Sequence, residues 1–380
     1  MDFSLTDEQI AFRRSVFDWA AATVAPGASD RDKDGRWDHE VWKSFGAQGL
    51  AGLPIAEEYG GAGGSIMDCV VANEAIAEGG HDGGFNLSLG AHWVIGSVPI
   101  WLHGTEEQKR RWLPGLTDGS MVGAWASTEP EAGSDAAGLL TTAVRDGDDW
   151  VLNGTKIFIT NGPIADVCTV LAKTGEKAAT AFIVDTTNPG FQVGRELDKM
   201  GCRSSPTAEI ALVDCRVPAD CVLGDEGAAL WQVAFECFDW ERTVMIASGV
   251  GGMQATLNSC IAYAKERKQF GKPIAQFQAV AHKLAEMKVK LETCRTAVYR
   301  AAYLKQTNAE HQMEASIAKY LVGELAVQNA LDAIQIHGGY GYLRDFNVER
   351  ALRDAKLGSI GGGTSEIQKL IISRLLLGDS

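Results

Sequence analysis

The spacing of apolar and polar positions divides the chain into three parts. Over residues 1–120, apolar residues recur every three or four positions, and this spacing predicts helices. Thr6 and Gln9 have the spacing of a capping box just before the first such run, which starts at Ile10, so we expect a helix to begin there. The glycine-rich segment 60–65 lacks the Lys of a phosphate-binding loop and is interpreted as a turn between helices.

Short β-type runs replace the helical spacing over residues 121–225. Runs such as 151–154 and 181–184 are bounded by Gly, Asn and Asp, as is typical of a compact antiparallel sandwich or barrel. Helical spacing returns over residues 226–380, where long amphipathic stretches predict a bundle of antiparallel helices. The sequence therefore predicts an α+β chain with a helical domain, a middle β domain and a second helical domain. This order is not a Rossmann alternation, and no G-x-G-x-x-G follows a strand.

Composition narrows the class of protein. Apolar residues make up 46% of the chain and charged residues 22%, as in globular proteins, and no window of eighteen apolar residues predicts a membrane span. The 35 basic and 49 acidic side chains give a net charge of −14, which argues against a nucleic-acid partner because such proteins need a basic surface. The start, from Met1 to Thr6, has neither a basic leader nor an Arg-rich face, so we expect a cytoplasmic protein.

The cysteines and histidines do not have the spacing of a metal site. No C-x-x-C or H-E-x-x-H occurs, which argues against zinc, a disulfide framework and a catalytic metal. We expect buried thiols in a reducing compartment. The eight cysteines are spread along the chain: Cys69, Cys168, Cys202, Cys215, Cys221, Cys237, Cys260 and Cys294.

Two segments of the middle part carry groups suited to a flat polar ring. The segment 125–135 (WASTEPEAGSD) offers hydroxyls and backbone amides, although by itself it also fits an ordinary loop. In KIFITNG (156–162), Phe158 and Thr160 are two residues apart, so on a strand they point to the same face. Phe158 could then cover a ring while Thr160 bonds its edge, or Phe158 could be a core residue.

Three further segments lie in the C-terminal part. RKQFGK (267–272), at the end of a long helix, has an Arg suited to a pyrophosphate, but it also fits a solvated basic helix end. QIHGG (335–339) has glycines that allow close approach of a ligand or another backbone. GGGTSEIQ (361–368) runs into a helix that Ser365 and Gln368 could cap, leaving free N–H groups for an anion or carbonyl.

The order of these segments resembles the acyl-CoA dehydrogenase family over essentially the whole chain. The similarity is carried by TEPEAGSD, KIFITNG, VDCRVPADCVLG, ERKQFGKPIAQFQ, QIHGGYGY and GTSEIQ. It implies an FAD-dependent acyl-thioester dehydrogenase with a C-terminal four-helix bundle, with FAD held across a subunit interface in a homotetramer, and with an electron-transferring flavoprotein as acceptor. The implied cofactor residues are Trp125, Ser127, Thr128, Ser134, Phe158 and Thr160 at the flavin; Arg267, Gln269, Phe270 and Gln278 at the adenine and pyrophosphate; and Gln335, Gly338, Gly339, Thr364 and Glu366. The implied substrate contacts are Ser134, Arg242, Gly361 and Gly362.

One departure from the family pattern concerns the base that removes the α-proton. In many relatives it is a Glu directly before the G-T of the last segment, but here that position is Gly362. The isovaleryl and long-chain branches instead place it on the first helix of the C-terminal domain, which matches Glu241. Glu241 shares a helical stripe with the apolar Cys237 and Val244, and burial there would raise its pKa toward that of a useful base. The alternative is a rim Glu paired with Arg242.

The substrate and the class of activity stay open from sequence. Gly361 leaves room where straight-chain relatives often carry an aromatic residue, which favours a short, branched or ring-bearing acyl group on coenzyme A. Enzymes that oxidise acyl or prolyl groups on carrier proteins also resemble this chain, as in ITNGPIADV and LETCRTAVYRA. A flavin oxidase and a non-catalytic scaffold are the remaining alternatives, and Glu241 argues against the scaffold.

Overall fold

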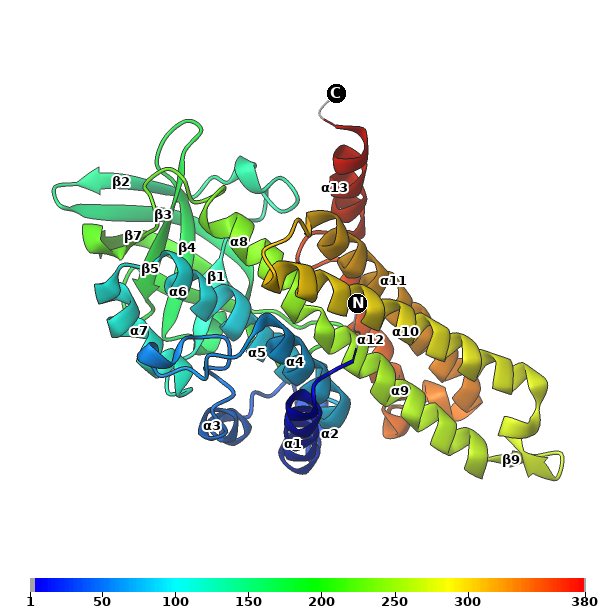
Figure 1. Ribbon diagram of the computed structural model, residues 1–380. Coiled ribbons are helices and arrows are strands. Elements are labelled where there is room, and N and C mark those ends of the chain that lie inside the picture. The colour runs from blue at the N-terminus through cyan, green and yellow to red at the C-terminus, as the bar shows by residue number, and fades with distance from the viewer. Residues whose placement is uncertain (1–3, 379–380) are drawn as a thin grey trace.

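The computed structural model describes residues 4–378, which follow the order helix, strand, helix (Figure 1). The predicted α+β fold is confirmed. Residues 1–3 lie outside the described residues. They belong to the start of the chain, for which the sequence predicts no leader. Within 4–378, no helix is long and apolar enough to cross a membrane.

The N-terminal part consists of helices, as its apolar spacing predicts. Thr6 and Gln9 form the expected capping box, with the Gln9 amide 3.2 Å from the Thr6 hydroxyl. The segment 60–65 is a turn, and its last residue, Ser65, caps the next long helix. A π-helical segment, η2, joins α5 to α6. The bounds are α1 (Asp7–Thr23), α2 (Ala28–Asp34), α3 (His39–Ala47), α4 (Ile66–Gly80), α5 (Gly83–Gly90), η2 (Ala91–Ser97), α6 (Val98–His103) and α7 (Glu106–Thr117).

The middle part is one sheet with the order β6-β7-β3-β2-β4-β5-β8 and with β1 beside β4. Most neighbours are antiparallel, as predicted, but β1 and β2 run parallel to β4. Both strands pair with β4, β1 along its first half and β2 at its end. The bounds are β1 (Gly123–Ala126), β2 (Thr142–Asp146), β3 (Asp149–Thr160), β4 (Val167–Lys173), β5 (Ala179–Asp185), β6 (Phe191–Glu196), β7 (Thr207–Pro218) and β8 (Val222–Leu223).

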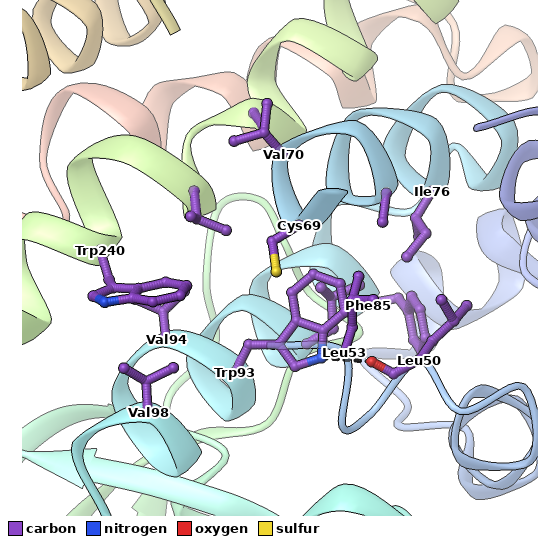
Figure 2. Close-up of a cluster of buried hydrophobic side chains, with 14 of the residues drawn as sticks. Leu50, Leu53, Cys69, Val70, Ile76, Phe85, Trp93, Val94, Val98 and Trp240 are labelled. Carbon is purple, nitrogen blue, oxygen red and sulfur yellow. Dashed lines mark hydrogen bonds between the residues drawn. The ribbon is translucent and has the colours of Figure 1, made fainter. Parts of the chain in front are cut away.

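The C-terminal part is a bundle of long helices that shares its core with the N-terminal helices, since α9 packs on both α4 and α11. Figure 2 shows this shared core, in which Trp93 donates to the Leu50 carbonyl at 2.8 Å and Trp240 and Val94 are both buried. The segment 267–272 lies at the end of a long helix, as expected: Arg267 is the C-cap of α9, and the residues after it form a short hairpin. The bounds are α8 (Val233–Trp240), η6 (Glu241–Met245), α9 (Ala247–Glu266), β9 (Lys268–Gln269), β10 (Lys272–Pro273), α10 (Gln278–Gln306), α11 (Gln312–His337), α12 (Val348–Lys356), η10 (Leu357–Ser359) and α13 (Ser365–Leu377).

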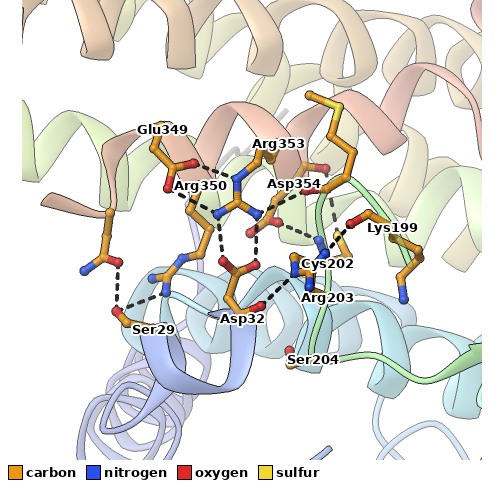
Figure 3. Close-up of polar contacts among 12 residues, drawn as sticks. Ser29, Asp32, Lys199, Cys202, Arg203, Ser204, Glu349, Arg350, Arg353 and Asp354 are labelled. Atoms are coloured by element: carbon orange, nitrogen blue, oxygen red, sulfur yellow. Dashed lines mark hydrogen bonds and ion pairs between the residues drawn. The ribbon is translucent and has the colours of Figure 1, made fainter. Parts of the chain in front are cut away.

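A polar junction joins the three parts of the chain (Figure 3). Arg353 on α12 pairs with Asp32 on α2 at 2.7 Å and donates to the Met200 carbonyl at 3.1 Å. The next residue, Asp354, accepts a hydrogen bond from the Cys202 backbone at 2.6 Å, and burial raises its pKa to about 7. These contacts fix the position of α12, which leads directly into the glycine segment 361–363.

All eight cysteines are free and buried, as expected from their spacing. Burial raises the pKa of their thiols, for example to about 12 for Cys168 and to about 11 for Cys215. They therefore behave as small apolar residues of the core.

Candidate active site

Glu241 lies in a π-helical segment, η6, between α8 and α9. The sequence predicted a continuous stripe at helical spacing, and the wider turn corrects that prediction. A π turn places one extra residue in the helix and rotates the side chains that precede it relative to those that follow. Thr243 stabilises the turn by donating to the Asp239 carbonyl at 2.8 Å. The Glu241 side chain is thereby directed toward the glycine segment near the C-terminus.

The Glu241 carboxylate faces Gly362 across a gap that fits no side chain. A Cβ built on Gly362 would lie 3.2 Å from Glu241 Cδ and 3.4 Å from each carboxylate oxygen. Gly362 also has a φ of +67°, which favours glycine. The structure thus brings the Glu241 carboxylate next to Gly362.

The Glu241 carboxylate makes no hydrogen bond or ion pair within residues 4–378. Burial raises its pKa above the usual value, while Arg242 and Lys319 oppose the shift. In the described residues, Glu241 therefore does not form the ion pair with Arg242 that the alternative interpretation required. A carboxylate with a raised pKa and no partner is suited to accept a proton near neutral pH.

Arg242 lies on the other side of the same loop. Its Nη2 is 3.5 Å from the position of a Cβ on Gly363, its guanidinium lies over the Phe238 ring, and its Nε is buried without a partner in the described chain. Gln368 donates to the carbonyls of Gly362 and Gly363 at 3.3 and 3.0 Å, which holds the loop against α13.

The cap of α13 differs from the prediction. Thr364 is the N-cap and accepts from the Ile367 amide at 3.3 Å, whereas Ser365 bonds Glu324 and Gln368 holds the loop. Thr364 is therefore one residue earlier than the cap expected at Ser365. Glu366 is exposed in the first turn of the helix, and Gly361 is exposed beside Leu357.

The middle domain gathers the first group of expected cofactor residues where β1 meets the end of β3. Trp125 and Thr169 are paired across β1 and β4, and the indole N–H and the hydroxyl are both buried without a partner in the described residues. Phe158 is 64% exposed with a φ of +59°, at a bulge in β3, while the next residue, Ile159, is buried. Thr160, two residues after Phe158, is half-buried at the end of β3.

The loop that follows β1 contains the rest of this group. Ser127 and Thr128 are half-buried, and Ser134 is exposed. Lys156, fully buried on β3, donates to the Ser127 carbonyl at 3.1 Å and to Glu129 at 2.7 Å. Burial would raise the pKa of Glu129, but its hydrogen bonds with Lys156, Thr141 and Leu140 overcome this and hold the pKa low. The buried pair ties the loop to β3.

A cavity of about 610 Å³ at the far end of the bundle gathers the second group. Five of the expected cofactor residues line it: Arg267, Gln269, Phe270, Gly338 and Gly339. Phe270 is 93% exposed with a φ of +52°, an unfavourable conformation for an aromatic residue. Gln278 and Gln335, also expected at the cofactor, are not among the residues that line this cavity.

Sequence reasoning missed several residues of the same cavity. The rings of Tyr263 and His337 stack with centroids 4.2 Å apart, Tyr340 lies under the Arg267 guanidinium at 5.3 Å, and Phe277 contacts Phe270 edge-on at 6.0 Å. Within one chain this cavity lies far from the large sheet. The cavity is next to β9, and Figure 1 shows β9 and the large sheet at opposite ends of the molecule. The structure therefore does not bring the two cofactor groups together in a single chain.

Comparison with known proteins decides the family. Profiles of the acyl-CoA dehydrogenase N-terminal, middle and C-terminal domains match residues 6–120, 124–215 and 231–377. The chain belongs to the acyl-CoA dehydrogenase family. It is 44% identical to a probable acyl-CoA dehydrogenase, YngJ, of Bacillus subtilis, covering 99% of this chain and 100% of that protein.

Two solved structures show the same fold over the whole chain. Butyryl-CoA dehydrogenase from Megasphaera elsdenii is 39% identical with a TM-score of 0.95, covering 99% of this chain and 100% of that chain. The prolyl acyl carrier protein oxidase AnaB is 37% identical with a TM-score of 0.95, covering 98% and 100%. The protein is thus an FAD-dependent oxidoreductase that acts on CH–CH groups of acyl thioesters.

The residues present fit FAD. The unpartnered Trp125 N–H and Thr169 hydroxyl are buried polar groups beside the exposed Phe158, and they would suit the edge and the face of a flavin ring. The cavity at the other end has aromatic rings for an adenine and Arg267 for a pyrophosphate. When bound, FAD supplies the acceptor for the hydride.

Proposed function

We propose that this acyl-CoA dehydrogenase introduces a double bond between the α- and β-carbons of a short, branched or ring-bearing acyl-CoA, with Glu241 as the base. The observation that carries the proposal is the Glu241 carboxylate, which faces Gly362 without a partner in the described residues. Glu241 takes the α-proton onto a carboxylate oxygen, and FAD, when bound, would accept the hydride that leaves the β-carbon. The substrate is oxidised by two electrons to an enoyl thioester.

The size of the acyl group is proposed from the walls of the site. Met245 of η6 packs on Gly90 of α5, since a Cβ there would lie 2.8 Å from Met245 Cγ. This contact closes the space between η6 and α5, and it favours a short acyl group. A Cβ on Gly361 would make only ordinary contact with Leu357 at 3.7 Å, so the glycine leaves room for a branch.

Replacement of Glu241 by Gln tests the base. The amide keeps the size of the side chain but cannot accept the proton, so anaerobic reduction of the flavin by acyl-CoA should fall by at least about 10²-fold. FAD content and acyl-CoA binding should stay close to those of the wild-type protein. Reduction of the Glu241→Gln flavin at the wild-type rate would show that another group is the base.

A second candidate is oxidation of an acyl or aminoacyl group on a carrier protein, favoured by the similarity to AnaB over 98% of the chain. Anaerobic titration with butyryl-, isobutyryl- and isovaleryl-CoA and with the same and prolyl groups on a carrier protein separates the two. Faster bleaching by coenzyme A thioesters supports the first proposal, and bleaching by carrier thioesters alone supports the second.

The electron acceptor and the assembly belong to the same proposal. We expect a homotetramer that passes electrons to an electron-transferring flavoprotein, as the family resemblance implies. Turnover in air with stoichiometric peroxide, and none with the flavoprotein or an artificial acceptor, would identify an oxidase instead.

A further inference from the structure

Lys319 is a buried cation without an ion pair in the described part of the chain. It lies in the first half of α11 and is 3% exposed. Its one hydrogen bond in the described chain is donated by Nζ to the Gly358 carbonyl at 2.7 Å. Because a buried charge is costly without a compensating carboxylate, its place in the fold needs an explanation beyond packing.

The Gly358 carbonyl marks the start of the loop that faces Glu241. It belongs to η10, three residues before the glycine segment 361–363. Gly323, one helical turn after Lys319, contacts the same carbonyl, since a Cβ on Gly323 would lie 2.6 Å from that oxygen. Helix α11 therefore fixes the start of the loop at two neighbouring points, by a hydrogen bond and by close backbone approach.

The charges that face Lys319 include the proposed base. Glu241 interacts with it from η6, Arg242 from the same segment, Glu324 from α11 and Glu366 from α13. Burial lowers the pKa of Lys319 to about 8, Glu241 raises it and Arg242 lowers it. Burial raises the pKa of Glu241, and Arg242 and Lys319 are the two cations that oppose this shift. Burial also raises the pKa of the nearby Cys237 thiol.

We propose that Lys319 is a positioning residue for the oxidation: its hydrogen bond to Gly358 places the glycine loop opposite Glu241, and its buried positive charge stabilises the ionised form of the Glu241 carboxylate. The inference rests on the proposed role of Glu241 as base. The two contributions are separable, because one depends on charge and the other on the place of a carbonyl.

The test is the pH dependence of anaerobic flavin reduction by the acyl-CoA that bleaches the wild-type protein fastest. The rate rises with pH as the base ionises. Lys319→Gln keeps a donor for Gly358 but removes the charge, so this rise should move to higher pH by about one unit, the lower end for loss of an adjacent opposite charge. The deficit should therefore be largest at low pH and shrink above the new midpoint. Lys319→Arg keeps the charge and should keep the wild-type midpoint.

Gly323→Ala is the matched control for position. The added methyl pushes the Gly358 carbonyl but leaves every charge in place, so it should lower the rate by a similar factor at all pH values without moving the midpoint. If Lys319→Gln is recovered without FAD, Lys319→Met is reconstituted with FAD and the midpoint of its pH dependence is measured instead.

The outcomes separate this inference from the proposed function. Wild-type reduction by Glu241→Gln would overturn the base assignment itself. Slow reduction by Glu241→Gln together with an unmoved midpoint in Lys319→Gln would overturn the role of the Lys319 charge alone. An unchanged rate in Gly323→Ala would overturn the positional role.

Discussion

At the scale of single residues, Glu241 and Gly362 share a space that holds one long side chain. Glycine at 362 serves two purposes: it adopts a φ of +67° without strain, and it leaves the space that the carboxylate occupies. Adding a Glu at 362 to the Glu241→Gln protein, the simplest way to move the base to the loop, would therefore place two long side chains in one space. A relocated base would need a small residue at 241 as well.

Gly362→Ala should impair both stability and rate. The positive φ should cost about 1–2 kcal/mol of unfolding free energy. The methyl would force the carboxylate to shift, and since a misplacement of about 1 Å costs up to about 10², flavin reduction should fall by roughly tenfold. Denaturant unfolding and stopped-flow reduction measure the two effects. Gly252→Ala, in open space on α9, is the control and should stabilise the helix by about 0.5–1 kcal/mol.

The sequence selected Glu241 as the candidate base, but it did not predict the setting of this side chain. The selection used the vacant position at Gly362, the apolar stripe around Glu241 and the base position of two branches of the resembled family. The π turn was not predictable, because it depends on how α8 and α9 pack rather than on the local residue pattern. Tyr263 and His337 were missed for a similar reason: in sequence they fit the ordinary helical spacing, and only the meeting of two helix ends stacks their rings.

At the scale of elements, one buried ion pair connects the loop after β1 to β3. Lys156 is fully buried, Glu129 nearly so, and Glu129 also accepts from the Leu140 and Thr141 amides. The position of this loop therefore depends on a charge pair in the interior. The strand periodicity predicted β3, but not the buried lysine, because Lys156 occupies an inward-facing position where apolar residues are the rule.

Breaking this pair should destabilise the protein strongly. Lys156→Met leaves the Glu129 carboxylate buried without its cation and should lower the free energy of unfolding by about 3–5 kcal/mol. The double variant Glu129→Gln, Lys156→Met removes both charges and should recover part of the loss. A thermodynamic cycle from denaturant unfolding measures the coupling. Equal stability of the single and double variants would contradict it.

At the scale of the whole molecule, the two groups of expected cofactor residues lie at opposite ends of one chain (Figure 1). The resemblance that selected them implied a cofactor shared between subunits, and neither spacing nor periodicity could locate the second half. The exposed Phe158 and Phe270, both with positive φ, suit surfaces that a cofactor or a neighbouring subunit covers.

A shared cofactor predicts complementation between two defective chains. Phe158→Ala and Arg267→Ala should each bind FAD weakly when expressed alone. If each FAD is bound by the β domain of one subunit and the bundle of its neighbour, mixed dimers contain one site with both changes and one with none. Random mixing should then restore about a quarter of the wild-type sites. Activity of the co-expressed pair measures this, and no gain over the separate variants would argue for a cofactor held within one chain.

The eight buried thiols can be used to detect local unfolding of the enzyme, because a buried thiol reacts only after it becomes exposed. They are distributed over all three parts of the chain, from Cys69 on α4 through Cys168 on β4 to Cys294 on α10. With raised pKa values and no access to solvent, they should resist alkylation in the folded protein and react only where the structure opens. Mass spectrometry after brief labelling with an alkylating reagent would therefore show which domain unfolds first on heating or on loss of the cofactor, and no residue has to be engineered for this.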